Sequence, residues 1–289
     1  MTRPSPTVRR RRLCSELRRL RTDLGLTIED VQERTGGDIG ISSLSRWETG
    51  ERSIRPNDLR ALLDVYGLTE GMERETLLTL CRQAKERGWW QSYGSAVPGW
   101  FQSYVGLESE ASVIYEYSAE LVPGLLQTAD YYRAFLSTAP ADADIDPKIR
   151  VRTERQERLT AADAPEYWAV LNEAVIRRGV GPDGTMRAQL ERLVELASLP
   201  DVTIQVLPFS AGVHPAMDGG FSILGFPEPS DPSVVYLENS AGSVYLEEAT
   251  EVERFGRMFS HIIAKALSPE DSRRLLSTAA ENAGHDENT

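Results

Sequence analysis

The segment at residues 42–52, which reads SSLSRWETGER, carries side chains that could bind a polar partner. Helical spacing places Leu44 and Trp47 on one side of this segment and the hydroxyl and guanidinium groups on the other. Hydroxyl groups can hydrogen-bond phosphates or base edges without steric demand, and a guanidinium can reach a guanine or a phosphate. The candidate nucleic-acid contacts in this segment are Ser42, Ser43, Ser45, Arg46 and Arg52.

Charge is unevenly distributed along the chain. The 289 residues have a net charge of −12, but those through Gly67 carry +3 and the remainder carries −15. Residues 1–22 hold eight arginines against the single acidic residue Glu16. Four of these arginines predict a basic arm that contacts DNA phosphates, and they are Arg9, Arg10, Arg11 and Arg12. The alternative is a solvated tail enriched in arginine by codon bias, since the chain has only three lysines.

Five short helices are predicted to position these side chains. A leucine repeat over 11–24 predicts the first helix, with Gly25 as its cap. Thr27 and Asp30 form a capping-box pattern at the start of the second helix, and Thr27 is a further candidate DNA contact. The third helix contains residues 42–47 and ends at Gly50. The last two helices are expected from Pro56 onward and over 70–87.

Short helices separated by a tight turn are typical of a helix-turn-helix domain. The stretch LRRLRTDLGLTIEDVQERTGGDIGISSLSRWETGERSIRPNDLRALLDVYGL resembles the Xre family of DNA-binding domains. The resemblance implies binding to double-stranded DNA, with the polar side of the third helix in the major groove. Two features depart from the family pattern: Gln32 replaces a small residue, and the turn TGGDIGI is about two residues longer than usual.

An aromatic segment follows the fifth predicted helix. Glycines and prolines interrupt this segment. We expect it to form a contact between domains or subunits, because an exposed row of aromatic side chains would promote aggregation. A ligand cage formed by these rings is the alternative. The aromatic residues are Trp89, Trp90, Tyr93, Trp100, Phe101 and Tyr104.

The second half of the chain changes from helical to strand periodicity. Residues 107–122 are expected to form a helix or a strand pair, with a Pro-Gly turn and a helix from Leu125 after them. Strands are predicted at 167–176, 202–209, 219–226 and 233–239. Further helices are predicted at 147–163, 185–200 and 250–269, with a polar tail after about 280. We therefore expect an α+β chain, in which an all-α five-helix helix-turn-helix domain precedes a mixed α/β domain.

The predicted domain boundaries follow these changes in composition. They are a basic arm at 1–12, a helix-turn-helix domain at 13–87, an aromatic junction at 88–107, an α+β effector or partner-binding domain at 108–277 and a polar tail at 278–289.

Blocks such as VPGLLQT and LPFSAGVH resemble the C-terminal domain of WhiJ-like, antitoxin-like regulators of sporulating soil bacteria. This resemblance implies a transcription regulator whose C-terminal domain senses a small ligand or a small partner protein encoded nearby. Weak candidates for that contact are Trp89, Trp90, Trp100, His214 and Asp218. We expect a homodimer, with the aromatic junction and the closing helix at 250–269 as its contact surfaces.

Catalysis is not expected. His214, Asp218, Glu238 and the Glu247–Glu248 pair could act as acids, bases or metal ligands, but no HExxH, GxSxG or P-loop motif accompanies them. Cys14 and Cys81 are expected to be buried free thiols, and neither a cofactor nor a metal site is expected. Two alternatives remain: an antitoxin that acts mainly by protein binding, and a metal-dependent hydrolase carried to DNA by its helix-turn-helix domain.

No apolar run approaches the roughly 20 residues that span a bilayer, and the basic start lacks the apolar core of a signal peptide. We therefore expect a cytoplasmic, nucleoid-associated protein without a membrane segment.

Overall fold

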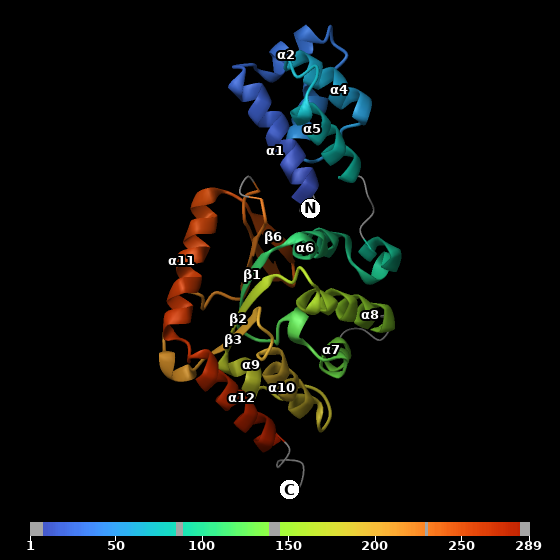
Figure 1. Cartoon of the computed structure of the whole chain (residues 1–289). Helices are drawn as coiled ribbons and strands as arrows, with labels where there is room; N and C mark the ends of the chain where they lie inside the picture. The colour runs from blue at the N-terminus through green and yellow to red at the C-terminus, as the bar shows by residue number, and fades with distance from the viewer. Residues whose placement is uncertain (1–7, 85–88, 139–144, 229–230, 284–289) are drawn as a thin grey trace. The chain divides into compact units, whose positions relative to one another are not determined.

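A computed structural model describes residues 8–84, 89–138, 145–228 and 231–283 (Figure 1). The chain divides into two compact units. Among the described residues, the first unit comprises those through Gln91 together with 102–107, and the second comprises 92–101 and those from Glu108 onward. The two units are described separately below.

The first unit has the five predicted helices. They are α1 (Val8–Asp23), α2 (Ile28–Arg34), α3 (Ile41–Glu48), α4 (Pro56–Val65) and α5 (Met72–Gln83). The predicted helix over 11–24 begins earlier, at Val8, so the Arg9–Arg12 run is helical. The end of the predicted helix at 70–87 falls partly on residues 85–88, which lie outside the described residues.

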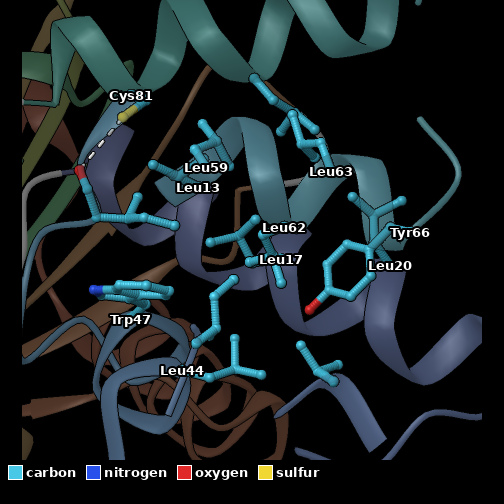
Figure 2. Packing of buried hydrophobic residues seen from close by; sticks show 14 of the residues in the cluster. Leu13, Leu17, Leu20, Leu44, Trp47, Leu59, Leu62, Leu63, Tyr66 and Cys81 are labelled. Atoms are coloured by element: carbon cyan, nitrogen blue, oxygen red, sulfur yellow. Dashed lines mark hydrogen bonds between the residues drawn. The ribbon is translucent and has the colours of Figure 1, made fainter. Parts of the chain in front are cut away.

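Leucines from α1, α3 and α4 form the core of this unit (Figure 2). Leu17, Leu44 and Leu62 have no exposed surface. The predictions for Cys14 and Cys81 are confirmed, because both are buried free thiols. Leu24 departs from the leucine pattern and is 50% exposed, because α1 ends at Asp23 and the following residue leaves the apolar side of the helix.

The second unit is built on a six-stranded mixed sheet with the order β3-β2-β1-β4-β5-β6. Strands β1, β2 and β3 are parallel, whereas β4, β5 and β6 continue the sheet in antiparallel pairs. The strands are β1 (Val113–Ser118), β2 (Glu166–Asn172), β3 (Val202–Leu207), β4 (Phe221–Gly225), β5 (Val234–Asn239) and β6 (Gly242–Leu246). The predicted α+β fold class is confirmed.

Helices and short 3-10 segments connect and cover the strands. The helices are α6 (Gly99–Glu110), α7 (Ala129–Leu136), α8 (Ile145–Gln156), α9 (Glu173–Arg177), α10 (Thr185–Leu196), α11 (Ala249–Lys265) and α12 (Pro269–Ala283). The 3-10 segments are η1 (Trp89–Ala96), η2 (Gly124–Leu126), η3 (Glu157–Thr160) and η4 (Phe209–Ala211). Among the described helices, none is both long and apolar enough to cross a bilayer.

Helix α11 covers one face of the sheet, and α7 and α8 lie on the other side (Figure 1). Phe259 stacks on Tyr115 of β1 with ring centroids 5.2 Å apart, and Phe255 meets Phe221 of β4 edge to face at 5.0 Å. Because its apolar side is buried in this way, α11 does not offer that side as the expected dimer surface.

The structure corrects several predicted boundaries in this unit. The strand predicted at 167–176 ends at Asn172, whose side chain caps α9 by accepting the Ala174 N–H at 2.9 Å. The helix predicted from Leu125 begins at Ala129, because Thr128 provides its N-cap. The sequence patterns left β1 ambiguous and missed both β6 and α12, and α12 extends into the predicted polar tail at 278–289.

Helix α12 also closes one edge of the sheet. The Val206 N–H of β3 donates to the Ser272 hydroxyl at 2.9 Å, and the Leu267 N–H donates to the Val206 carbonyl at 2.9 Å. An uncovered edge strand would present unpaired backbone groups to other chains. Helix α12 and the segment before it therefore pair both backbone groups of Val206 at the β3 edge within the same chain.

A buried ion pair joins α6 and α8. Arg155 donates from Nε and Nη2 to the two carboxylate oxygens of Glu108, each at 2.7 Å, and the side chains are 5% and 2% exposed. The Arg155 guanidinium also lies over the Phe101 ring. On β1 nearby, burial raises the pKa of the Glu116 carboxyl to about 7, although Tyr167 donates a hydrogen bond to it.

Replacing Glu108 by Ala should lower the free energy of unfolding by about 3–5 kcal/mol, because Arg155 would remain as a buried charge without its partner. Urea unfolding of the full chain, followed by far-ultraviolet circular dichroism, measures this loss. Glu253→Ala is the matched control, since it removes an exposed i,i+4 pair with Arg257 that contributes about 0.5 kcal/mol or less. Equal losses in the two variants would contradict this role for the Glu108 pair.

Candidate nucleic-acid interface

Helices α2 and α3 form a helix-turn-helix whose ends are fixed by local hydrogen bonds. The predicted capping box is confirmed: the Thr27 hydroxyl accepts the Asp30 N–H at 3.0 Å, and the Asp30 carboxylate accepts the Thr27 N–H at 2.8 Å. These bonds, with the backbone bond from Thr27 the largest cause, lower the pKa of Asp30. Thr27 is exposed at the start of α2, and its hydroxyl already accepts a hydrogen bond from the backbone of that helix.

The turn between α2 and α3 depends on glycine. Gly36 and Gly37 have φ values of 61° and 90°, a region that side-chain-bearing residues rarely adopt. The Thr35 hydroxyl donates to the Val31 carbonyl and accepts the Ile39 N–H, which ties the turn to α2. The buried Ile39 then leads the chain into α3. The two glycines therefore set the direction in which α3 leaves α2.

The buried apolar residues of α3 lie on one side of the helix, as predicted. Leu44 and Trp47 are buried, at 0% and 7% exposure. Ser42 and Arg46 are exposed, whereas Ser43 and Ser45 are half-buried. The sequence patterns missed Ile41, the first residue of α3, which is 40% exposed. The predicted DNA contacts were all polar side chains, so this apolar residue was not among them.

Arg46 lies back along its own helix in this structure. Its Nε donates to the Ser42 carbonyl at 2.9 Å, and its Nη2 lies 3.3 Å from the Ser42 hydroxyl. Both contacts are solvent-exposed, so the side chain can exchange them for another acceptor at small cost. Arg52 is also exposed, and its backbone N–H donates to the Arg46 carbonyl at 3.0 Å. The two guanidiniums thus start from neighbouring backbone positions at the end of α3.

A bidentate ion pair anchors the same C-terminal end of α3 to α1. Arg21 of α1 donates from Nε and Nη2 to the Glu48 carboxylate at 2.7 and 2.8 Å, and from Nη1 to the Leu26 carbonyl at 2.7 Å. The Arg21 and Glu48 side chains are only 12% and 6% exposed. The hydrogen bond with Glu48 raises the pKa of Arg21. This pair holds the last residue of α3 against α1.

The sequence contained a signal for this pair. Arg21 follows Leu17 by four residues, so helical spacing places it on the apolar side of α1. A charged residue on a buried side usually has an opposite charge as its partner. Spacing alone, however, could not identify Glu48 among the acidic residues of the domain.

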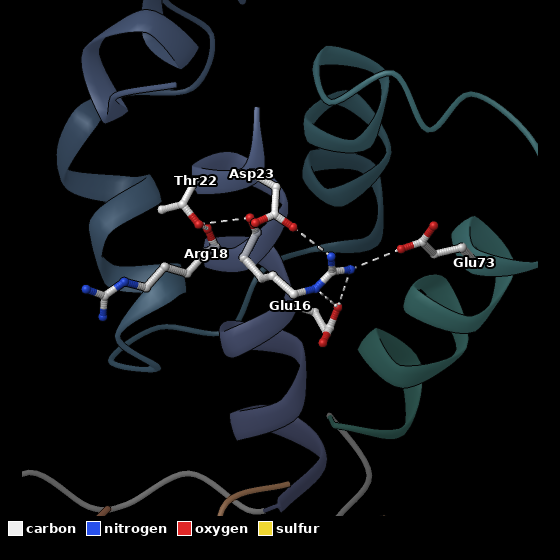
Figure 3. Close-up of polar contacts among 6 residues, drawn as sticks. Glu16, Arg18, Thr22, Asp23 and Glu73 are labelled. Carbon is white, nitrogen blue, oxygen red and sulfur yellow. Dashed lines mark hydrogen bonds and ion pairs between the residues drawn. The ribbon is translucent and has the colours of Figure 1, made fainter. Parts of the chain in front are cut away.

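The arginines of α1 differ in their availability to DNA. Arg19 is held by three carboxylates, those of Glu16, Asp23 and Glu73, and the bond with Glu16 is the largest cause of its raised pKa (Figure 3). Arg18 is exposed, and its side chain extends away from those carboxylates in Figure 3. Arg18 is therefore better placed than Arg19 to meet a phosphate.

The predicted phosphate contacts Arg9 to Arg12 occupy the first turns of α1. Successive helical residues are rotated by about 100° around the axis, so four in a row cannot face one phosphate backbone together. Arg11 is buried, and Arg9, Arg10 and Arg12 are half-buried. The helix therefore separates these four side chains rather than aligning them.

The weak candidates for a ligand or partner contact are divided between the two units. Trp89 and Trp90 pack edge to face with ring centroids 5.9 Å apart, and the Trp100 side chain lies outside the described part of the structure. His214 lies in the loop between β3 and β4, with its Nε2 3.4 Å from the Tyr117 hydroxyl. Burial lowers the pKa of His214, and Asp218 is exposed.

The carboxylates considered for catalysis do not assemble a metal site within the described ranges. The Tyr236 hydroxyl donates to Glu238 at 2.8 Å, whereas Glu247 and Glu248 are exposed just before α11. Among the residues that the structure describes, no three His, Cys, Asp or Glu side chains are arranged to hold a metal ion.

Replacing Glu48 by Ala should lower the free energy of unfolding of the first unit by about 3–5 kcal/mol, because Arg21 would lose its buried partner. Hydrogen exchange of α1 and α3 in the full chain, read by mass spectrometry, should speed up accordingly. Glu73→Ala is the control, since it removes only an exposed contact with Arg19. The double variant Arg21→Met, Glu48→Leu should recover most of the stability, and failure of Glu48→Ala to exceed the control would refute the anchoring role.

Comparison with known protein families assigns both parts of the chain. A helix-turn-helix domain model matches residues 12–77, which contain α2, α3 and the turn between them. A model described as a domain of unknown function, DUF5753, matches residues 101–278. Searches of curated proteins and of solved structures give no match. The helix-turn-helix match indicates a DNA-binding regulator, and the chain belongs to the DUF5753 family.

Proposed function

We propose that this protein is a sequence-specific transcription regulator of the Xre type, which places α3 in the major groove of double-stranded DNA. The observation that carries the proposal is the polar side of α3, formed by the exposed Ser42 and Arg46 and the half-buried Ser45, on a helix that Leu44 and the Arg21–Glu48 pair hold in place. A fixed helix with short polar side chains can approach base edges closely.

The proposed DNA contacts divide by type. Arg46 is the proposed base-reading residue, because a guanidinium can bond both acceptors of a guanine. Ser42, Ser43 and Ser45 are proposed to contact base edges or phosphates beside it. The proposed phosphate contacts are Thr27, Arg52, Arg9, Arg10 and Arg12, while the burial of Arg11 makes it the weakest member of that group.

We infer that the DUF5753 domain senses a small partner protein, which the resemblance to WhiJ-like, antitoxin-like regulators implies as one of two possibilities. The support is the loop after β3, where Phe209, Val213 and Met217 are 61%, 79% and 65% exposed. Several exposed apolar side chains on one loop are typical of a protein contact. The loop is held in place, since Lys265 donates to the Val213 carbonyl at 2.6 Å.

A small ligand remains the second candidate for what this domain senses. A cavity of about 300 Å³ lies between the start of α10 and the end of α12, with Arg177 and Arg178 among its lining residues. The side chains of both arginines are already paired, with Glu173 and Glu120 respectively. The paired charges favour the partner protein over an anionic ligand.

The remaining features of the proposal follow from this role. The protein would act in the cytoplasm on the nucleoid, without catalysis of its own. Residues 13–87 would form the DNA-binding domain and residues 108–277 the sensing domain, with the aromatic junction at 88–107 between them. An antitoxin that acts mainly through protein binding would share this architecture but would not require Arg46.

Arg46→Ala should weaken binding to the preferred DNA site by about 1–3 kcal/mol and relax the choice of base at one position, since a lost bidentate contact has this size. Sites selected from random duplexes by the full chain, followed by competition binding, measure both effects. Arg82→Ala is the matched control, because Arg82 is an exposed arginine on α5. Unchanged affinity and site preference in Arg46→Ala would refute the proposed recognition helix.

We also propose a homodimer, because one small helix-turn-helix makes few contacts, and two copies of α3 about 34 Å apart can occupy successive major grooves. Sedimentation of the full chain at micromolar concentration should give twice the monomer mass, and footprinting should protect a two-fold or repeated site. A monomer both free and on its DNA site would contradict the homodimer.

A further inference from the structure

Ile41 occupies an unusual place for an apolar side chain. It is the first residue of α3 and is 40% exposed, while the other large apolar residues of the helix, Leu44 and Trp47, are buried. A single exposed apolar residue on a surface is ordinary by itself. What distinguishes Ile41 is its position on the helix that the proposed function places in the major groove.

The helical rotation fixes what surrounds Ile41. Ser45 lies one turn later and only about 40° away around the axis, so the two side chains are neighbours on one stripe. Ser42 lies about 100° from Ile41 in the same direction around the axis and is exposed, whereas the buried Leu44 lies about 60° away in the opposite direction. Both serines are short, so neither can cover the Ile41 side chain. Ile41 therefore forms an apolar projection at the border of the polar side of α3.

The end of the helix at which Ile41 lies also matters. In helix-turn-helix proteins the N-terminal residues of the recognition helix contact base edges. Ile41 has the N-terminal position of α3, and Gly40 before it has no side chain that could stand between Ile41 and a base. An apolar side chain at this point would lose affinity against polar base edges, unless it met an apolar group.

The major groove offers one such group, the C5 methyl group of thymine. We propose that Ile41 is a specificity-determining residue that selects thymine in each half-site by packing on this methyl group. The inference rests on the proposed function, because it requires α3 to enter the major groove. It adds a base preference that the polar residues of α3 do not supply.

Deoxyuridine provides a direct test, because it keeps the hydrogen-bonding groups of thymine and lacks only the methyl group. The preferred site is first selected with the full-length protein, and each thymine is then replaced by deoxyuridine in turn. At one thymine per half-site, the wild-type protein should bind about 4-fold less tightly after replacement, which corresponds to burial of about one methyl group. Replacement at the other thymines should have little effect.

The Ile41 variants then identify the contact. Ile41→Ser should bind the thymine and deoxyuridine sites with nearly equal affinity, because serine has no methyl group, and Ile41→Val should keep part of the difference. Met72→Ser is the matched control, since Met72 is an 87% exposed first residue of α5 and its replacement should keep the full difference. Hydrogen exchange of α3 verifies that each variant is folded.

The outcomes separate this inference from the proposed function. A selected site without a thymine in its half-sites, or an equal loss on replacement in wild type and Ile41→Ser, would overturn the role of Ile41 while sequence-specific binding stood. Failure to select any preferred site would overturn both. Loss of the difference in Ile41→Ser, with its retention in Met72→Ser, is the supporting result.

Discussion

The bidentate bond between Arg21 and Glu48 is the constraint on which the first domain depends most. Helix α3 has only eight residues, and a helix of this length is not stable by itself in water. Its direction must therefore come from tertiary contacts. Leu44 and Trp47 fix its inward side, but apolar packing alone tolerates small rotations and shifts. The pair of parallel hydrogen bonds to Glu48 adds a defined geometry at the end of the helix.

This constraint also explains how short polar side chains could serve in recognition. A serine hydroxyl reaches only a short distance from the backbone, so Ser42 and Ser45 can act at a base edge only if the helix approaches closely and in one orientation. Arg46 has a long side chain and tolerates more variation in that orientation. The rigid attachment of α3 therefore matters more for the serines, and for the short contact proposed for Ile41, than for Arg46.

Much of the first domain could be predicted because its signals are local. Leucine spacing, the Thr27 capping box and Pro56 each act within a few residues of the chain, and the structure has a helix at each place. The parts that could not be predicted depend on distant partners. Glu48 pairs with a residue 27 positions away. The Arg46 side chain hydrogen-bonds to Ser42 one turn earlier in its own helix, a contact that helical spacing permits but does not require.

The second domain shows the same division between local and distant causes. Strands β2, β3, β4 and β5 are rich in buried apolar residues and were identified, although their ends were not. Strand β1 was ambiguous because Glu116 interrupts its apolar pattern, and that carboxyl is accommodated by the Tyr167 hydroxyl on the neighbouring strand. Helix α12 was missed although it has helical periodicity: most of it was assigned no element, and its last residues fall in the predicted polar tail at 278–289. Its Ser272 accepts the Val206 N–H of β3, a contact that depends on a distant partner.

The unequal distribution of charge connects these two domains to the proposed role. The residues beyond Gly67 carry −15, which would repel DNA, and much of the positive charge of α1 is not free to oppose it. Arg19 and Arg21 are held by carboxylates, and Arg11 is buried. Nonspecific attraction to phosphate is therefore weaker than the eight arginines at the start of the chain suggest. Under the proposed function, affinity would then depend more on close, direct contacts of α3 with base edges, and for these contacts the Arg21–Glu48 pair would have to fix the helix.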